Sequence, residues 1–295
     1  MKKISLSFLL IFCINIGISQ IIDVHLHSYT DEDYYGGRPY PLGNISSPAT
    51  AKGHLKRTIE LMDSLHIEYA VISNSLKANE KWMEADDRFI PGYSAGTDLI
   101  PVDEFEQLIK NGKIKVFGEV GSVYDGTTLT NPIYKPYIEI CEKYGIPVMY
   151  HTGPPAPHSE SKAKRIFKGD PALIEDIIAT YPNIKICLQH AGAIFWENAV
   201  ILMAYYPNVY SDLGVLFWAS PISEEIAVNF LKKCKNYGVL NKVMYGTDQM
   251  VWPESMVVSI DKFNALGFLT EKEKQMILYD NAKEFLGLVD APNHK

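Results

Sequence analysis

Apolar residues recur along this chain in two alternating patterns, short continuous runs and longer stretches with helical spacing. The short runs, rich in β-branched and aromatic residues, indicate buried strands, and the stretches with apolar residues three and four positions apart indicate amphipathic helices. The predicted strands are Ile21–His27, Tyr69–Ser73, Phe89–Ala95, Lys115–Val120, Pro147–His151, Lys185–His190, Asn208–Leu213 and Lys242–Asp248. The predicted helices are Thr50–Leu65, Val102–Lys110, Ile133–Tyr144, Pro171–Thr180, Ile194–Tyr205, Ile222–Asn236, Glu254–Leu266 and Glu271–Leu286.

This alternation predicts an α/β fold, and strand–helix units of this kind fit a parallel (β/α)8 TIM barrel. The alternative is an open doubly wound sheet, which carries a glycine-rich phosphate-binding turn after its first strand in nucleotide-binding proteins. Here the first strand is followed instead by a long loop of tyrosines, glycines, prolines and acids, Ser28–Ser47. The barrel is therefore favoured, and the loop is expected to form a lid or a wall of a substrate pocket.

The N-terminal segment has the pattern of a secretory signal peptide. Lys2 and Lys3 precede an apolar run that ends at Ile18, and Gly17 and Ser19 supply the small residues of a cleavage site. We expect cleavage after Ser19, which leaves residues 20–295 as a single barrel domain in the periplasm or outside the cell. The apolar run is too short for a comfortable bilayer span, so no stable membrane anchor is expected.

Composition narrows the range of partners. The chain of 295 residues is 47% hydrophobic and 21% charged, as expected for a globular domain with its own core. A formal charge of −7 argues against nucleic acid, because a phosphate backbone binds basic surfaces. Cys13 would leave with the signal peptide, and the odd number of remaining cysteines favours buried thiols over disulfides. A small-molecule substrate is the expected partner, and the sequence leaves monomer and homodimer open.

Polar side chains end several of the predicted strands. His25 and His27 lie one residue apart in the first strand, so strict alternation would place both on one face. Val24 and Leu26 would then point the other way. The later strands end in Glu119, His151, His190 and Asp248. Because the carboxyl ends of barrel strands meet at one mouth, where active sites form, these groups are expected to share a site. Imidazole and carboxylate groups together suit a divalent transition metal.

These residues lie in motifs that resemble the amidohydrolase superfamily. The motifs are Asp23–His27, Gly118–Gly121, Tyr150–Gly153, Gln189–Gly192 and Tyr245–Asp248. The branch that they resemble is the amidohydrolase-related group that also holds aminocarboxymuconate-semialdehyde decarboxylase, and Asn281–Leu288 resembles the closing helix of that branch. The resemblance spans Ile21 to Leu288 and implies a barrel of the metal-dependent hydrolase type.

The resemblance also implies a role for each residue. His25, His27, His151 and Asp248 would bind a divalent metal, with zinc as the expected ion. Asp248 would also accept a proton from the metal-bound water. His190 would either bind a second metal or, in a one-metal site, polarise the substrate or move protons. Many members of the superfamily carry a carboxylated lysine on strand four that bridges two metals, and Glu119 stands there in this chain as a candidate bridge.

Two reactions fit this site. A metal that makes hydroxide available near neutral pH supports hydrolysis of a small amide, ester or lactone, which is the leading hypothesis. Non-oxidative decarboxylation of an unsaturated or aromatic carboxylic acid needs the same metal and a cationic pocket, and it is the alternative. A phosphodiesterase is disfavoured because the loops lack a basic bias. A non-catalytic binding protein is disfavoured because every ligand type is present.

Substrate selection is expected in the loops that follow the strands. The candidate substrate-binding residues are Tyr35, Arg38, His158 and Trp252. Further candidates are Tyr34, Trp82, Lys162, Arg165 and the pair Phe217–Trp218. Exposed lysines and arginines are more often simply solvated, and loop aromatics often plug the mouth of a barrel. Asp212, at the end of the seventh strand, is a candidate for orienting a ligand.

Overall fold

The computed structural model describes residues 20–40, 42–157 and 159–288. The predicted signal peptide and the candidate substrate-binding residue His158 lie outside these residues. Eight parallel strands form one sheet in chain order. They are β1 (Ile21–His27), β2 (Ile67–Asn74), β3 (Phe89–Ala95), β4 (Val116–Val120), β5 (Val148–His151), β6 (Ile186–Gln189), β7 (Val209–Asp212) and β8 (Val243–Met244). The predicted α/β fold of the (β/α)8 barrel type is therefore confirmed.

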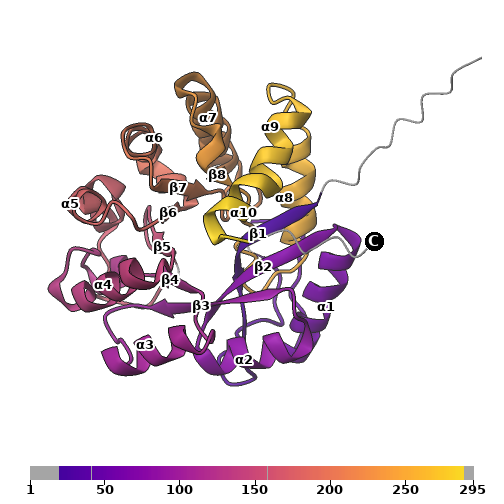
Figure 1. The fold of residues 1–295 in the computed structure, drawn as a ribbon. Coiled ribbons are helices and arrows are strands. Elements are labelled where there is room, and N and C mark those ends of the chain that lie inside the picture. Colours follow the sequence, from indigo (N-terminus) through magenta and orange to yellow (C-terminus); the bar gives the residue numbers. More distant parts are fainter. Residues whose placement is uncertain (1–19, 41, 158, 289–295) are drawn as a thin grey trace, which may run out of the picture.

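The helices surround the strands as an outer layer (Figure 1). They are α1 (Ala51–Ser64), α2 (Leu76–Ala85), α3 (Val102–Lys110), α4 (Lys135–Tyr144), α5 (Glu175–Thr180), α6 (Trp196–Tyr205), α7 (Pro221–Tyr237), α8 (Ser255–Asn264), α9 (Glu271–Gln275) and α10 (Asn281–Leu286). The sequence reading missed α2, and it merged α9, a π-helical turn and α10 into one helix. None of the described helices is long and apolar enough to cross a membrane.

Contacts outside the regular ladder join the first strand to the last. β8 is shorter than predicted, because the chain from Tyr245 to Asp248 forms no regular strand. Even so, the Val24 amide donates to the Tyr245 carbonyl at 3.0 Å, and the Asp248 amide donates to the His25 carbonyl at 2.7 Å. The buried Asp23 carboxylate accepts the Thr247 amide at 2.9 Å and also the Thr247 hydroxyl. These bonds close the barrel beside the two histidines of β1.

The barrel interior is filled by one apolar side chain or more from every strand. Ile22, Val24, Val71, Ile90, Val116, Met149, Cys187, Tyr210 and Met244 form this cluster, and Ala282 and Phe285 of α10 pack against it. The prediction that Val24 and Leu26 point the same way is wrong, because Val24 belongs to this interior cluster and Leu26 to the layer outside the strands. A register shift in β1 between Asp23 and Leu26 breaks the strict alternation, so Val24 packs inside and His25 follows it toward the mouth. An apolar plug thus forms the floor beneath the polar mouth.

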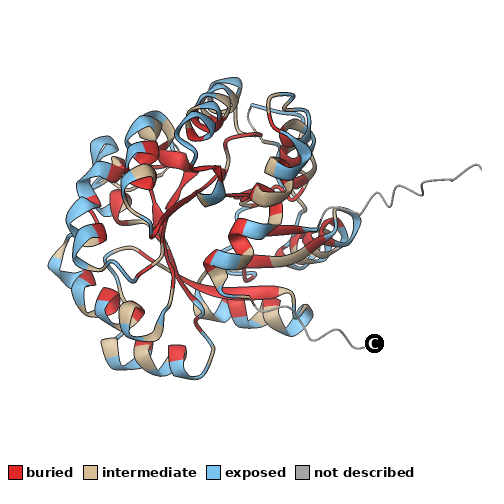
Figure 2. Ribbon diagram, turned by 45° about the horizontal axis from the view of Figure 1, so that its top comes forward, coloured by how far each residue is buried: buried red, intermediate tan, exposed pale blue. Residues whose placement is uncertain are grey.

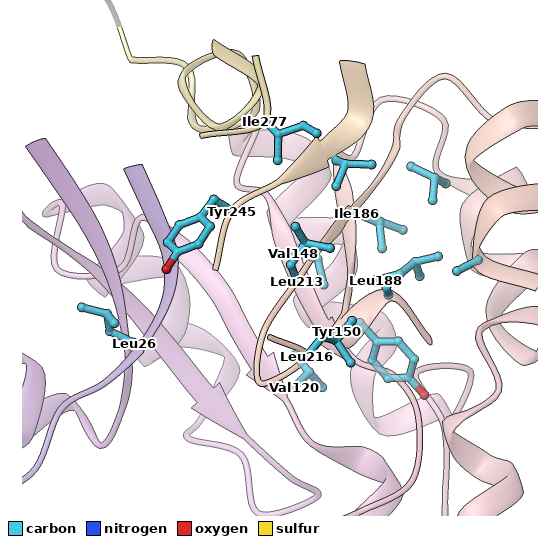
Figure 3. Packing of buried hydrophobic residues seen from close by; sticks show 14 of the residues in the cluster. Leu26, Val120, Val148, Tyr150, Ile186, Leu188, Leu213, Leu216, Tyr245 and Ile277 are labelled. Atoms are coloured by element: carbon cyan, nitrogen blue, oxygen red, sulfur yellow. The ribbon is translucent and has the colours of Figure 1, made fainter. Parts of the chain in front are cut away.

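A second apolar layer lies between the strands and the helices. Figure 3 shows part of it, including Leu26, Val148, Ile186, Leu188 and Tyr245. Colouring by burial shows the strands almost wholly buried and the outer helix faces exposed (Figure 2). At about 25 cal/mol per Å2 of apolar surface removed from water, these two layers supply the main driving force for folding. They hold the strand ends, and therefore the polar residues on them, in fixed positions.

Candidate metal centre

The polar residues that end the strands come together at the mouth of the barrel. His25 and His27 lie on β1, Glu119 on β4 and His151 at the end of β5. His190 follows β6 directly, and Asp248 follows β8. All six side chains are buried or nearly so.

His25 is oriented by the carboxylate of Asp212, which ends β7. The Nδ1 atom of His25 lies 2.9 Å from Asp212 Oδ2, and both side chains are fully buried. Asp212 Oδ1 also accepts the backbone amides of His190 at 2.8 Å and Gly214 at 3.0 Å. A methyl group at Gly214 would lie only 2.8 Å from His25 Nδ1, so the residue must be glycine. This packing leaves the Nε2 atom of His25 facing the mouth.

His27 is oriented by backbone and amide groups. Its Nδ1 atom lies 3.1 Å from the Ser73 carbonyl, which fixes Nδ1 as the protonated nitrogen. The Gln249 side chain accepts the His27 amide at 3.0 Å. The Nε2 atom of His27 therefore also faces the mouth with a free lone pair, as a metal ligand requires.

Two overlapping groups of ligand atoms result. In the first, Glu119 Oε2 lies 3.5 Å from His25 Nε2 and 3.4 Å from His27 Nε2. Asp248 Oδ1 joins this group, 2.9 Å from His27 Nε2 and 3.9 Å from His25 Nε2. In the second, His151 Nδ1 lies 2.5 Å from the other Glu119 oxygen, Oε1. His190 Nε2 lies 3.1 Å from His151 Nδ1 and 3.4 Å from Glu119 Oε1. Glu119 stands between the two groups and offers one oxygen to each.

Electrostatics at the mouth favour bound positive charge. Burial raises the pKa of Glu119, but hydrogen bonds from His151, His190 and His25 outweigh it and hold that pKa well below its usual range. Burial would lower the pKa of His25, but the charges of Asp248 and Asp212 outweigh it and raise that pKa well above normal. The carboxylates that attract protons to these imidazoles would attract a metal cation for the same reason.

These residues fit a divalent transition metal. Imidazole nitrogens and carboxylate oxygens are suitable ligands, and in each of three groups of three residues the ligand atoms lie within 4.8 Å of one another. Asp248 Oδ1 is buried and accepts no hydrogen bond from any described residue. A buried carboxylate oxygen without a donor is costly unless a cation satisfies it. The first group therefore offers a ligand set for one divalent ion, and the second group offers ligands for another.

His190 and Asp248 have backbone angles that non-glycine residues seldom adopt. The φ angle of His190 is 60° and that of Asp248 is 50°. Both lie in the left-handed region, which costs on the order of 1 kcal/mol for such residues. The hydrogen bond from the Asp248 amide to the His25 carbonyl helps to hold the backbone of Asp248 in this conformation.

A pocket of about 880 Å3 opens above the cluster. Its floor includes His27, Glu119, His151, His190 and Asp248, and its walls are mostly apolar and aromatic. Three of the predicted substrate-binding residues, Tyr35, Arg38 and Trp252, line it. The Arg38 guanidinium lies 5.0 Å from the centre of the Tyr35 ring and 6.0 Å from that of Trp252. Among the lining residues that the structure describes, Arg38 is the only lysine or arginine.

Other sequence candidates do not line this pocket. Trp82 is fully buried in α2, where it packs against Phe89, because its segment is a helix rather than the predicted loop. Phe217 packs against Phe263 in the core. Tyr34, Lys162, Arg165 and Trp218 are likewise absent from the described lining.

Sequence reasoning missed three pocket tyrosines, Tyr29, Tyr40 and Tyr124. Tyr29 is two residues beyond His27, a position that could have suggested it. Tyr124, whose ring centre lies 5.1 Å from that of His151, stands in a short turn after β4 and had no distinguishing sequence signal.

A barrel with histidines and carboxylates gathered at its mouth belongs to the class of metal-dependent barrel hydrolases and their relatives. The family model described as "Amidohydrolase" matches residues 22–288, so the chain belongs to the amidohydrolase family. A curated relative, the 2-amino-3-carboxymuconate-6-semialdehyde decarboxylase of Dictyostelium discoideum, is 27% identical over 207 residues, 58% of this chain and 53% of that protein. The chain covers only 11% of another curated relative.

Two solved structures show the same fold. One is a probable 2-pyrone-4,6-dicarboxylic acid hydrolase from Acinetobacter baumannii with citric acid bound, with a TM-score of 0.67 and 16% identity over 91% of this chain and 99% of that one. The other is a 5-carboxyvanillate decarboxylase from Sphingomonas paucimobilis, with a TM-score of 0.60 and 12% identity over 92% of this chain and 100% of that one. The similarity extends along nearly the whole of each barrel.

Proposed function

We propose that this protein is a hydrolase that uses a divalent metal, with zinc as the expected ion, to cleave a small amide, ester or lactone that carries a carboxylate. The observation that supports it is the cluster of six histidine and carboxylate residues, of which all but the fully buried His25 line the floor of one pocket. Family membership supports metal-dependent chemistry but does not select the substrate.

The residues around the cluster have the properties that hydrolysis needs. A divalent ion bound there supplies the positive charge that makes hydroxide available near pH 7. Asp248 lines the pocket, and with Oδ1 directed to the ion its other carboxylate oxygen can accept the proton that water gives up. Burial opposes the charged form of His190, but the hydrogen bond to Glu119 outweighs it and raises the pKa. His190 is therefore suited to donate a hydrogen bond to a substrate oxygen that becomes negative.

Arg38 supports a substrate that carries a carboxylate. It lines a pocket whose other walls are mainly apolar, and its guanidinium lies within cation–π distance of the Tyr35 and Trp252 rings. A planar guanidinium binds a carboxylate with two parallel hydrogen bonds. The Acinetobacter baumannii neighbour, named for the hydrolysis of a dicarboxylic acid, agrees with this class of substrate.

Decarboxylation of an unsaturated or aromatic carboxylic acid is the alternative. The same cation and pocket would bind the acid, and a curated relative and a structural neighbour are both named as decarboxylases. Either reaction would use the metal ligands proposed above. The products differ, because hydrolysis releases no carbon dioxide.

The test begins with metal content per chain by elemental mass spectrometry on protein purified without chelator. The metal-loaded protein is then assayed on small lactones, esters and amides with and without a carboxylate, and on aromatic carboxylic acids. Proton release without carbon dioxide supports the hydrolase, and carbon dioxide release selects the alternative. Absence of bound metal, with no gain on adding zinc or manganese, would refute both and favour a binding protein.

We also propose that residues 1–19 direct export and are then removed. The support is the charge and hydropathy pattern of that segment. Mass spectrometry of the mature N-terminus tests it, with residue 20 expected first. An intact N-terminus on protein recovered from the cytoplasm alone would refute it.

A further inference from the structure

Exposed apolar side chains concentrate on one side of the barrel. Of eleven large hydrophobic side chains that are exposed among the described residues, six belong to the segment from 166 to 205. We call these six the α5–α6 strip: Ile166, Phe167, Leu173, Ile194, Ile201 and Tyr205. Phe167 and Tyr205 are 76% and 77% exposed. Single exposed apolar residues are common on proteins, but a concentration of this kind marks an interaction surface.

The strip is continuous in space as well as in sequence. The ring of Phe167 lies 6.0 Å from that of Phe195, the neighbour of Ile194. Asn198 on the outer face of α6 donates to both carboxylate oxygens of Asp170, which joins α6 to the turn that carries Leu173. α5 and α6 are adjacent in the outer layer (Figure 1). At the far end, Ile201 and Tyr205 border a surface hollow of about 380 Å3.

α6 differs from most of the other long outer helices. Its ten residues include a single charged side chain, Glu197, whereas α1 and α7 each carry several lysines and acids. A helix with apolar residues all round is normally covered on every side. The inner face of α6 packs on the core through Ala199, Val200, Leu202 and Met203, yet Ile201 and Tyr205 face outward. The outer face of α6 therefore exposes two large apolar side chains beside Glu197 and Asn198.

Charges of opposite sign lie at the two ends of the strip. Lys162, Lys164, Arg165 and Lys168 follow β5 at the mouth end, and Lys164 bonds the carbonyl of the pocket residue Ser159. Glu175 and Asp176 start α5, and Glu175 accepts the hydroxyl of Tyr206, just after the base end of α6. Within the described chain none of these six residues forms an ion pair, although many other surface lysines do. The acids of the mouth end are Glu160, Asp170 and Glu197, so its four cations leave an excess of one positive charge.

We propose that the α5–α6 strip is the interface of a homodimer in which the strip of one copy packs on the same strip of the other. A two-fold contact uses the same patch on both copies, so the patch must be complementary to itself. With the two-fold axis through the middle of α6, the two α6 helices of the dimer lie antiparallel. This arrangement buries the six apolar side chains and places the basic end of each copy against the acidic end of the other.

This interface adjoins the pocket without entering it. The segment that follows β5 contains Ser159 and Glu160, which line the pocket, and residues 162–168, which lie at the proposed interface. A partner copy would therefore contact, from outside, the segment that forms one wall of the pocket.

The first experiment measures molar mass by size-exclusion chromatography with light scattering over a wide range of concentration. The wild-type protein is expected to be a dimer. Ile201→Asp buries a charge at the centre of the contact, which weakens a dimer by about 30-fold or more at a central position. Ile222→Asp is the matched control, because Ile222 is an exposed isoleucine of α7 that does not belong to the strip. It should leave the dimer intact.

A second experiment tests the antiparallel charge pairing. Lys162→Glu with Lys168→Glu makes both ends acidic, and Glu175→Lys with Asp176→Lys makes both ends basic. Each double variant alone should become monomeric, since its copies repel at both ends. An equimolar mixture of the two should form a heterodimer with the wild-type mass. Circular dichroism and the thermal midpoint establish that each variant is folded.

Three outcomes overturn the proposal. A wild-type protein that is monomeric at all concentrations would show that the strip does not bind a second copy. If that monomer bound anionic vesicles, the strip would be a membrane-binding surface instead. A dimer that survives Ile201→Asp as well as it survives Ile222→Asp places the interface elsewhere. Variants that dimerise alone and do not mix refute the two-fold arrangement.

Discussion

The carboxylate of Asp212 offers a way to perturb the candidate metal centre without changing a ligand. Burial raises its pKa, but the charge and hydrogen bond of His25 outweigh that and lower it, so the group is ionised and accepts hydrogen bonds only. His25 must then carry its proton on Nδ1 and present Nε2 to a metal. Asp212→Asn keeps the shape of the side chain. Its oxygen can still accept the His190 and Gly214 amides, but its NH2 group faces His25 Nδ1.

Two donors now face each other, so the favoured response is a change of tautomer that moves the His25 proton to Nε2. That nitrogen can no longer bind a metal. Loss of a carboxylate that orients a metal-binding histidine costs about 10- to 100-fold in metal affinity. Because the asparagine also favours the wrong tautomer, we expect the upper part of this range, roughly 2.7 kcal/mol.

The assay is zinc affinity of the metal-free protein by competition with a chromogenic chelator, with the thermal midpoint measured in parallel. Ser211→Ala is the control, since the buried Ser211 hydroxyl donates to the Leu188 carbonyl at 2.6 Å beside Asp212. It should cost about 1 kcal/mol of stability and leave zinc affinity unchanged. Wild-type zinc affinity in Asp212→Asn, or an equal loss in Ser211→Ala, would show that Asp212 does not orient His25.

Three further predictions follow from the same structure. His25→Ala should abolish turnover and lower metal content, and a fully active variant would refute the ligand assignment. Glu119→Gln should lower the number of bound metals per chain, and unchanged stoichiometry and rate would leave Glu119 with a structural role. His54 is buried, and burial lowers its pKa from 6.5 to about 3. The unfolded chain therefore binds more protons than the folded one between these pH values. As the pH falls from 6.5 toward 3, the free energy of unfolding decreases by about 1.4 kcal/mol per pH unit, and above pH 6.5 His54 causes no such loss. His54→Phe, which preserves the packing against Trp82, should flatten that fall in thermal unfolding, and an identical profile would contradict the assignment.

Periodicity was enough to predict the barrel because most strands are short apolar runs that alternate with helices. It failed for α2, whose apolar residues are few and whose Trp82 is the main buried anchor. It also failed at Val24, because alternation assumes a regular strand and the register shift in β1 depends on its neighbours. Neither departure alters the order of the strands.

The candidate site was predicted from a positional rule, that polar residues at the carboxyl ends of barrel strands converge. What the rule could not supply is which groups touch. The contact between His25 and Asp212 joins positions 187 residues apart, and it depends on how β1 and β7 are placed across the barrel. The sequence analysis did not single out α6, because only the structure shows which of its apolar side chains the core covers and which are exposed.

The closure of the barrel between β1 and the segment after β8 also sets the order of events as the protein matures. Asp23 and Thr247 are 224 positions apart, and His27 and Gln249 are 222. Contacts this distant form late, since loop closure must be achieved before they stabilise anything. The full ligand set for an ion therefore does not exist on a partly synthesised or truncated chain. If the protein crosses a membrane unfolded, it acquires its metal on the far side, from whatever supply that compartment holds.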